Sequence, residues 1–232
     1  MPKQLSRTDQ VLLYWLARTG GLRAEDARKY PGLEHIRTTE AMTKRLDRLC
    51  AAGYVAASPL LRGPRLYRLS QKGARLTSAP NSYTAKPTAG KLVQLVSISA
   101  VGARVKEVVF VSPQQLASLA QDLSVDPIPA NFPGRFALRT FPASDAANGH
   151  DGETHVFYWL AENRSPENLV KRVETIIAKL RTYALFASLI ELDLFGVAVA
   201  VPSMAAKAAL EQKPFPTKTE FWVLEQLHDV IP

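Results

Sequence analysis

The sequence has very little of the chemistry that common enzyme classes use. It contains one cysteine, Cys50, so an internal disulfide and a cysteine-based zinc site are both excluded. Its four histidines lie without metal-ligand spacing: His35, His150, His155 and His228. No phosphate-binding glycine loop, Gly-x-Ser-x-Gly elbow or His-Glu-x-x-His pattern occurs. We therefore expect no catalytic residues, no metal and no cofactor.

Long apolar runs are also missing. The sequence has no run of about 18 apolar residues and no charged-then-apolar leader with a cleavage site. These absences predict a soluble, cytoplasmic protein that does not contact the membrane. At 47% apolar residues the chain can form a buried core, and 232 residues suggest one large or two small domains.

The positive charge is confined to one part of the chain. Residues 1–77 contain 15 Lys and Arg and 6 Asp and Glu, which gives a net charge of +9. Residues 78–232 have a net charge of −1, so the protein is not basic throughout. Clustered positive charge gathers DNA phosphates through counterion release, and the first segment is therefore a candidate for DNA binding.

Residues 37–53 have the pattern of one amphipathic helix. Its apolar positions share one face and comprise Met42, Leu46, Leu49 and Cys50. A threonine can cap its first turn, and Gly53 can end it because glycine readily adopts left-handed backbone angles. The opposite face carries side chains suited to phosphate and base-edge contacts: Thr43, Lys44, Asp47 and Arg48. An ordinary solvated helix face is the alternative.

The segments that flank this helix favour DNA binding. A first helix is expected from a capping box at Ser6 and Asp9, and a second at residues 22–30 with Arg23 facing outward. Two strands are expected at residues 54–58 and 65–69, joined by a turn, and Leu76 is expected to pack back in the helical turn that follows them. This order is that of a winged helix-turn-helix, in which the third helix enters the major groove and the hairpin contacts the backbone or minor groove.

The predicted DNA-binding residues lie in the third helix and the hairpin. They are Arg37, Thr38, Thr39, Thr43, Lys44, Arg48, Arg62 and Arg65. Of these, Thr39, Thr43 and Lys44 are expected to read bases, whereas Arg62 and Arg65 are expected to contact phosphates.

The rest of the chain predicts a linker and a second domain. Residues 78–90 are rich in Ser, Thr, Pro and Ala, which indicates a linker. Residues 91–232 alternate between strand and helix patterns, which predicts an α/β domain. The expected strands are 108–111, 135–141, 154–161, 196–201 and 220–224, and the expected helices are 112–123, 166–183 and 203–212. Residues 92–105 fit either a helix or a strand.

Three segments, 5–9, 45–55 and 69–76, resemble the replication-relaxation family, whose members are bacterial proteins largely of plasmids and other mobile elements. MarR-like repressors share these signals. The resemblance implies an N-terminal winged helix, a C-terminal domain with a restriction-endonuclease-like fold, and a role in replication, mobilisation or control of transfer genes.

The match to the family's C-terminal acidic pattern is incomplete. Glu162, Arg164 and Glu167 fit it, but Gly134 and Asn163 replace two acidic residues. A Mg²⁺-dependent nuclease of this fold class needs at least two carboxylates and a lysine near the attacking water. We therefore expect a degenerate, non-catalytic nuclease-like domain.

Two acidic residues, Asp145 and Asp151, could substitute for the missing ligands, although a polar turn commonly carries aspartate for its own geometry.

Three interpretations of the function follow. The preferred one is a sequence-specific double-stranded DNA-binding protein, acting as a transcription regulator or a replication or mobilisation accessory factor, whose C-terminal domain forms a homodimer or docks a protein partner. The second is a divergent Mg²⁺-dependent endonuclease targeted by the winged helix. The third is a protein-interaction module.

Overall fold

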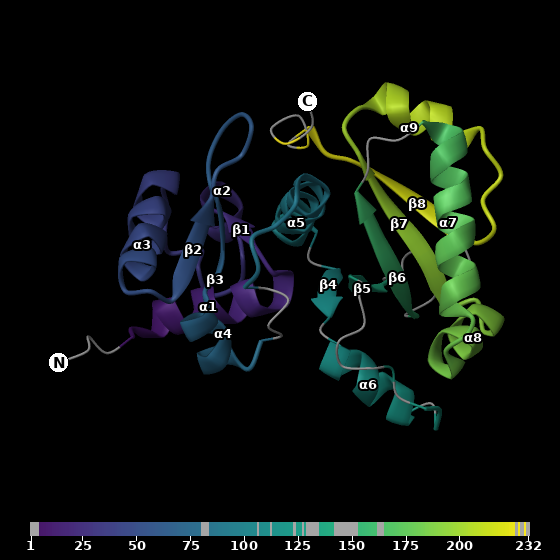
Figure 1. The fold of residues 1–232 in the computed structure, drawn as a ribbon, viewed down its shortest axis with the longest axis horizontal. Helices are drawn as coiled ribbons and strands as arrows, with labels where there is room; N and C mark the ends of the chain where they lie inside the picture. Colours follow the sequence, from purple (N-terminus) through teal and green to yellow (C-terminus); the bar gives the residue numbers. More distant parts are fainter. Residues whose placement is uncertain are drawn as a thin grey trace. The chain divides into compact units, whose positions relative to one another are not determined.

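The chain is a mixed α+β protein with two units (Figure 1). A computed structural model describes residues 5–79, 84–105, 107–111, 113–122, 124–126, 128, 135–141, 153–161, 165–225, 227 and 230. Unit 1 comprises residues 1–105 and 226–232, and unit 2 comprises residues 106–225. Among the described residues, no helix has the length and apolar character needed to span a bilayer.

Unit 1 combines helices with a small antiparallel sheet. Its elements are α1 (Arg7–Thr19), β1 (Leu22–Arg23), α2 (Ala24–Ala27), α3 (Thr39–Ala51), β2 (Val55–Ser58), β3 (Leu66–Leu69), α4 (Gln71–Thr77) and α5 (Ala89–Gly102). The strands are ordered β1-β3-β2, and both pairings are antiparallel. The apolar faces of α1 and α3 meet the sheet in one core that includes Leu12, Leu16, Met42, Leu46 and Tyr67.

The ends of α1 and α3 follow the local sequence. Ser6 and Asp9 form the expected capping box at the start of α1. The hydroxyl of Thr38 accepts from the backbone N–H of Ala41 and caps α3. Gly53 ends α3 with a φ of +76°, a region that glycine enters without steric cost. The amphipathic helix predicted at residues 37–53 is therefore confirmed.

The helix expected at residues 22–30 is wrong. Leu22 and Arg23 form β1, which pairs with Tyr67 and Leu66 of β3, and only Ala24–Ala27 is helical. Arg23 was expected to face outward, but its side chain is only 2% exposed and forms ion pairs with Glu25 and Asp26. The local pattern could not reveal a pairing with a strand more than 40 residues away, because that pairing depends on tertiary structure.

Two further expectations in unit 1 are corrected or resolved. Leu76 of α4 does not pack back into the core, since 56% of it is exposed. The ambiguous segment at residues 92–105 forms most of helix α5, capped by Thr88. Its apolar residues surround the helix axis, which removes the one-sided pattern that would have distinguished a helix from a strand.

Helix α5 belongs to unit 1 through buried hydrogen bonds. The Ser99 hydroxyl donates to the Asp26 carboxylate at 2.9 Å and accepts from the backbone N–H of Arg23 at 3.0 Å. The Tyr30 hydroxyl donates to the Ser99 carbonyl oxygen at 3.2 Å. Burial raises the pKa of Asp26, against the opposing effects of Arg23 and Ser99. The division between the units consequently falls after residue 105, C-terminal to the boundary expected at residue 91.

Unit 2 is a five-stranded sheet with helices. Its elements are β4 (Val108–Val111), α6 (Pro113–Asp122), β5 (Phe136–Thr140), β6 (Thr154–Ala161), α7 (Pro166–Leu180), α8 (Ala184–Glu191), β7 (Phe195–Val201), α9 (Met204–Glu211) and β8 (Lys218–Val223). The strands are ordered β4-β5-β6-β7-β8, with antiparallel pairing up to β6 and parallel pairing from β6 to β8. Every strand predicted in this domain is confirmed, with bounds that shift by up to two residues.

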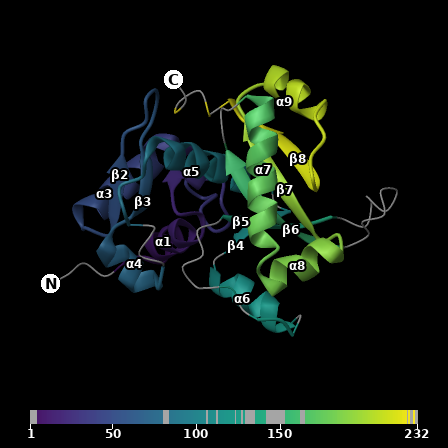
Figure 2. The ribbon, with the colours of Figure 1, turned by 45° about the vertical axis from the view of Figure 1, so that its right-hand side comes forward.

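The helices of unit 2 bury one face of its sheet (Figure 2). Alternate residues of β6 point into this core together with the apolar stripe of α7. The ring of Phe186 in α8 stacks on that of Phe136 in β5, with 5.0 Å between the ring centroids. Helix α8, which follows α7 after a break of three residues, was not predicted from the sequence. Nearly all residues of β6 and β7 are buried. Because successive side chains of a strand point to opposite faces of the sheet, burial on both faces accounts for their almost continuous apolar sequence.

The residues on which the nuclease-like interpretation depends lie outside the described residues. They are Gly134, Asp145, Asp151, Glu162, Asn163 and Arg164. Glu167, which is described, lies in the first turn of α7, and its carboxylate is 2.9 Å from the ammonium of Lys213.

Candidate nucleic-acid interface

The start of α3 and the β2–β3 hairpin tip lie at the same end of unit 1. The turn at Gly53 joins α3 to β2, so the strand runs back along the helix toward the helix N-terminus (Figure 1). Residues 61–65 at the hairpin tip are all exposed, and Gly63 has a φ of +91° that suits a tight turn. An exposed polar helix start and a basic turn therefore form one surface.

The three side chains expected to read bases differ in their exposure and in the contacts that they make within α3. Thr39 is exposed in the first turn of α3. The hydroxyl of Thr43 donates to the Thr39 carbonyl oxygen at 2.9 Å, so its proton is used within the helix and its oxygen remains an acceptor. Lys44 is 76% exposed, with its Nζ 2.7 Å from the carboxylate of Glu40. An exposed pair of this kind is weak and can be exchanged for another anion.

Two of the arginines predicted to bind DNA are available in the free protein. Arg62 is exposed at the hairpin tip, and Arg37 is exposed just before α3. Within the part of the chain that the structure describes, neither guanidinium forms an ion pair. The Arg28 guanidinium donates to the Arg37 carbonyl oxygen at 3.4 Å, which leaves the Arg37 side chain unaffected.

Arg48 has a structural contact that the sequence did not reveal. Its Nη2 lies 2.8 Å from Oδ1 of Asp9 in α1, and Nη1 of Arg45 lies 2.9 Å from the same oxygen. Asp9 is only 4% exposed and also accepts from the hydroxyl and backbone N–H of Ser6. These two arginines fix α3 against the start of α1.

The electrostatic balance at Asp9 favours its charged form. Burial by itself raises the pKa of this carboxyl, but the hydrogen bonds from Ser6 and Arg45, together with the positive charge of Arg48, hold it below its ordinary value. Ionised Asp9 therefore stabilises the packing of α1 on α3. The prediction that Arg48 contacts DNA remains a prediction.

A second acidic residue, Asp47, connects α3 to the hairpin. The Tyr67 hydroxyl donates to its Oδ1 at 2.9 Å, and Nη1 of Arg65 lies 3.5 Å from the same oxygen. Burial of Tyr67 and its hydrogen bond to this carboxylate raise the pKa of Tyr67 to about 12. The surface that was predicted to bind DNA thus contains an acidic residue of α3 that contacts two residues of the hairpin.

The supporting residues Asp9, Arg45 and Tyr67 were not predicted from the sequence. The capping box identified Asp9 as a helix cap but gave no sign that arginines 36 and 39 positions later contact it. Tyr67 has the pattern of an ordinary strand residue. The only available signal was the i, i+3 spacing of Arg45 and Arg48, which places both on one side of the helix.

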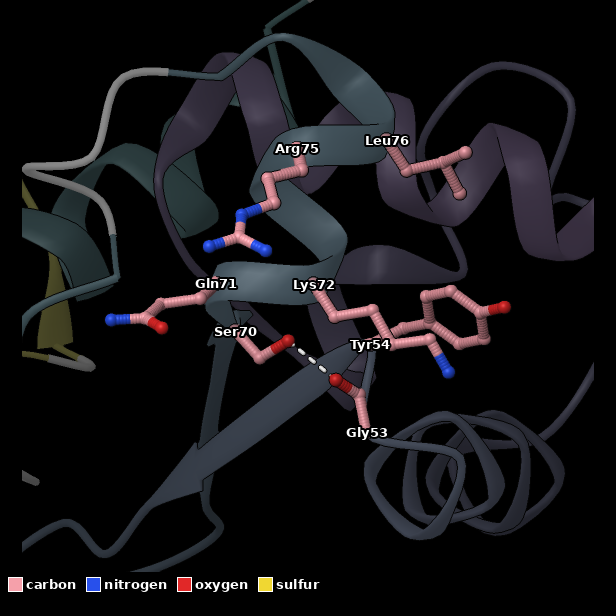
Figure 3. Close-up of a pocket in the computed structure, with 7 residues that line it drawn as sticks. All are labelled: Gly53, Tyr54, Ser70, Gln71, Lys72, Arg75 and Leu76. Carbon is pink, nitrogen blue, oxygen red and sulfur yellow. Dashed lines mark hydrogen bonds between the residues drawn. The ribbon is translucent and has the colours of Figure 1, made fainter.

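An open hollow lies near the other end of α3, where α4 begins (Figure 3). Its lining residues are Gly53, Tyr54, Ser70, Gln71, Lys72, Arg75 and Leu76. The ammonium of Lys72 lies 4.0 Å from the centre of the Tyr54 ring and donates to the carbonyl oxygen of Ala52 at 3.0 Å. A cation beside the last carbonyls of a helix is stabilising, so Lys72 has a structural role here.

No group of three or more His, Cys, Asp or Glu side chains converges among the residues that the structure describes. His155 is fully buried in β6, beside Glu153 and edge-on to the ring of Phe141.

Comparison with known proteins adds no further constraint. A scan against models of protein families, a search of curated proteins and a search of solved structures found no significant match. The function of this chain therefore has to be argued from its own residues.

Proposed function

We propose that the protein binds double-stranded DNA in a sequence-specific manner through α3 and the β2–β3 hairpin of unit 1. The observation that carries the proposal is the joint surface of the α3 start and the hairpin tip, which combines hydroxyl, ammonium and guanidinium groups within the segment of net charge +9. The order of three helices followed by a hairpin supports interpreting this part of unit 1 as a winged helix.

Under this proposal, each group on the surface has a distinct role. Thr39, Thr43 and Lys44 enter the major groove and contact base edges. Arg62 and Arg37 contact phosphates, which position the protein without reading sequence. Removing a base-reading side chain should cost about 1–3 kcal/mol of binding free energy and relax specificity at one base pair.

The direct test uses purified full-length protein and labelled fragments from its own upstream region and the neighbouring intergenic DNA. Binding is titrated at two salt concentrations, without and with Mg²⁺. Tight binding to one fragment without cleavage would support the proposal. Cleavage in the presence of Mg²⁺ would instead support an endonuclease, and absence of binding at low salt would rule out this function.

A matched pair of variants tests the assigned surface. Arg62→Ala should weaken binding to all sequences alike and reduce the slope of log affinity against log salt by about 0.9, because one phosphate contact is lost. Lys171→Ala removes an equally exposed positive charge from α7 in unit 2 and should leave the slope unchanged. Equal losses in the two variants would contradict the hairpin assignment and point to α7 as a DNA contact.

A further inference from the structure

The surface proposed to bind DNA contains the carboxylate of Asp47, which accepts a hydrogen bond from a buried tyrosine. Asp47 is 44% exposed, and its Oδ1 accepts from the hydroxyl of Tyr67, a residue that is only 2% exposed. The guanidinium of Arg65, which is 63% exposed, approaches the same oxygen at 3.5 Å. One carboxylate oxygen therefore has one buried neutral partner and one exposed charged partner.

The two contacts differ in how readily they can be exchanged. The hydroxyl that donates to Asp47 belongs to a buried side chain, and breaking this bond would remove its hydrogen-bond partner at a cost in free energy. The Arg65 contact is longer than a direct charge-assisted hydrogen bond of about 2.7–2.9 Å, and both of its side chains reach solvent. An incoming anion can therefore displace Asp47 from Arg65 while Tyr67 keeps Asp47 in position.

We propose that Asp47 competes with DNA phosphates for Arg65 and so weakens the phosphate-dependent, sequence-independent part of DNA binding. This inference rests on the proposed DNA-binding function. When a phosphate takes Arg65, the carboxylate stays on Tyr67 close to the DNA backbone, and its charge opposes that of the phosphates. This repulsion weakens phosphate contacts on every sequence alike. Binding to DNA of arbitrary sequence, which depends on those contacts alone, then has a low affinity, whereas a specific site retains the affinity that base contacts from α3 add.

The same helix provides a matched control. Glu40 also carries one negative charge and lies 2.7 Å from Lys44, but both side chains are 76% exposed and the pair lies within α3. Glu40→Gln and Asp47→Asn therefore change the net charge equally. The side-chain amide introduced by Asp47→Asn retains an oxygen that can accept from Tyr67, so this substitution removes the charge while preserving the buried hydrogen bond.

The experiment measures binding of the full chain to a short duplex of arbitrary sequence over a series of salt concentrations. The proteins are the wild type, Asp47→Asn, Glu40→Gln, Arg65→Ala and the double variants that combine each acidic substitution with Arg65→Ala. Thermal unfolding of each protein confirms that it is folded. Asp47→Asn should bind several-fold more tightly than the wild type, with a salt slope steeper by up to about 0.9.

The effect of Asp47→Asn should disappear in the Arg65→Ala background, because no arginine remains for the carboxylate to hold. Glu40→Gln should instead have the same effect with and without Arg65, because its partner is Lys44. An effect of Asp47→Asn that persists without Arg65 would overturn the assignment of Asp47 while leaving the DNA-binding proposal intact. Absence of salt-dependent binding by the wild type would overturn both.

Discussion

The two units of this protein use charge and burial in contrasting ways. In unit 1, the longest strands have four residues, and the acidic residues Asp9 and Asp47 link secondary-structure elements through arginines and a tyrosine. In unit 2, β6 and β7 have eight and seven residues, and apolar side chains form the core against α7 and α8. Unit 1 is therefore held by specific polar contacts as well as a core. Apolar burial dominates in unit 2, although a half-buried ion pair also joins Arg139 of β5 to Glu220 of β8 there.

This difference matters for function because exposed charge is available for recognition only where it is not needed for folding. The surface formed by α3 and the β2–β3 hairpin contains cations with structural partners, such as Arg48. It also contains cations without an ion pair among the described residues, such as Arg62. Mutations that change charge in unit 1 should thus separate into those that affect stability and those that affect binding.

The largest effect should come from a glycine in unit 1. A Cβ atom at Gly73 would lie 2.1 Å from the carbonyl oxygen of Tyr54, a backbone atom that cannot move without disturbing β2. Gly73→Ala should therefore destabilise unit 1 by more than about 4 kcal/mol, measured by urea denaturation. Gly90→Ala is the control, since a Cβ there meets nothing within 4 Å, and it should be neutral or slightly stabilising. Equal stability of the two variants would contradict the close packing of α4 on the start of β2.

The next largest effect tests the apolar core of unit 2. Phe186 is fully buried between Phe136 and Phe195, so Phe186→Ala should lower the free energy of unfolding by about 3–5 kcal/mol. Because the proposed DNA contacts all lie in unit 1, the folded variant should keep the salt-dependent DNA affinity of the wild type. If the Phe186→Ala variant were folded but had lost this affinity, DNA binding by unit 1 would depend on unit 2.

A smaller effect is expected at Asp9, and it should depend on pH. Asp9→Asn removes the charge that Arg45 and Arg48 contact and should cost about 2 kcal/mol of stability near neutral pH. The folded pKa of Asp9 lies below its ordinary value of 3.8, so its stabilising contribution is present above that pH and is lost as the pH falls through the folded pKa. The stability difference between wild type and variant should therefore narrow below about pH 4. A difference that stays constant with pH would show that the charge of Asp9 is not responsible.

The smallest effect provides the counterpart in unit 2. Glu211 forms an i, i+4 pair with Lys207 at 3.5 Å on the surface of α9. Glu211→Gln should change the free energy of unfolding by about 0.3 kcal/mol or less, because exposed pairs are screened by water and salt. A change as large as that of Asp9→Asn would remove the contrast between the two units.

Local sequence patterns predicted the parts of the fold that depend on neighbouring residues. The capping box of α1, the apolar stripe and glycine end of α3, and the apolar run of β7 each combine residues within one element. Their geometry follows from helix and strand periodicity, which the sequence displays directly.

The same approach failed where distant residues decide the outcome. Leu22 and Arg23 form a strand only because β3, more than 40 residues later, offers an edge for pairing. The boundary of unit 1 moved because Ser99 of α5 bonds to Asp26, 73 positions earlier. Neither contact leaves a short-range pattern.

The sequence by itself determined the mixed helix and strand content, most element positions, and the concentration of positive charge in residues 1–77. Only the tertiary structure decided which cations have partners, since Arg48 meets Asp9 and Arg65 meets Asp47 across different elements. The physical reason is that charge is a property of each residue, whereas the partner of a charge depends on how the folded chain brings separate elements together.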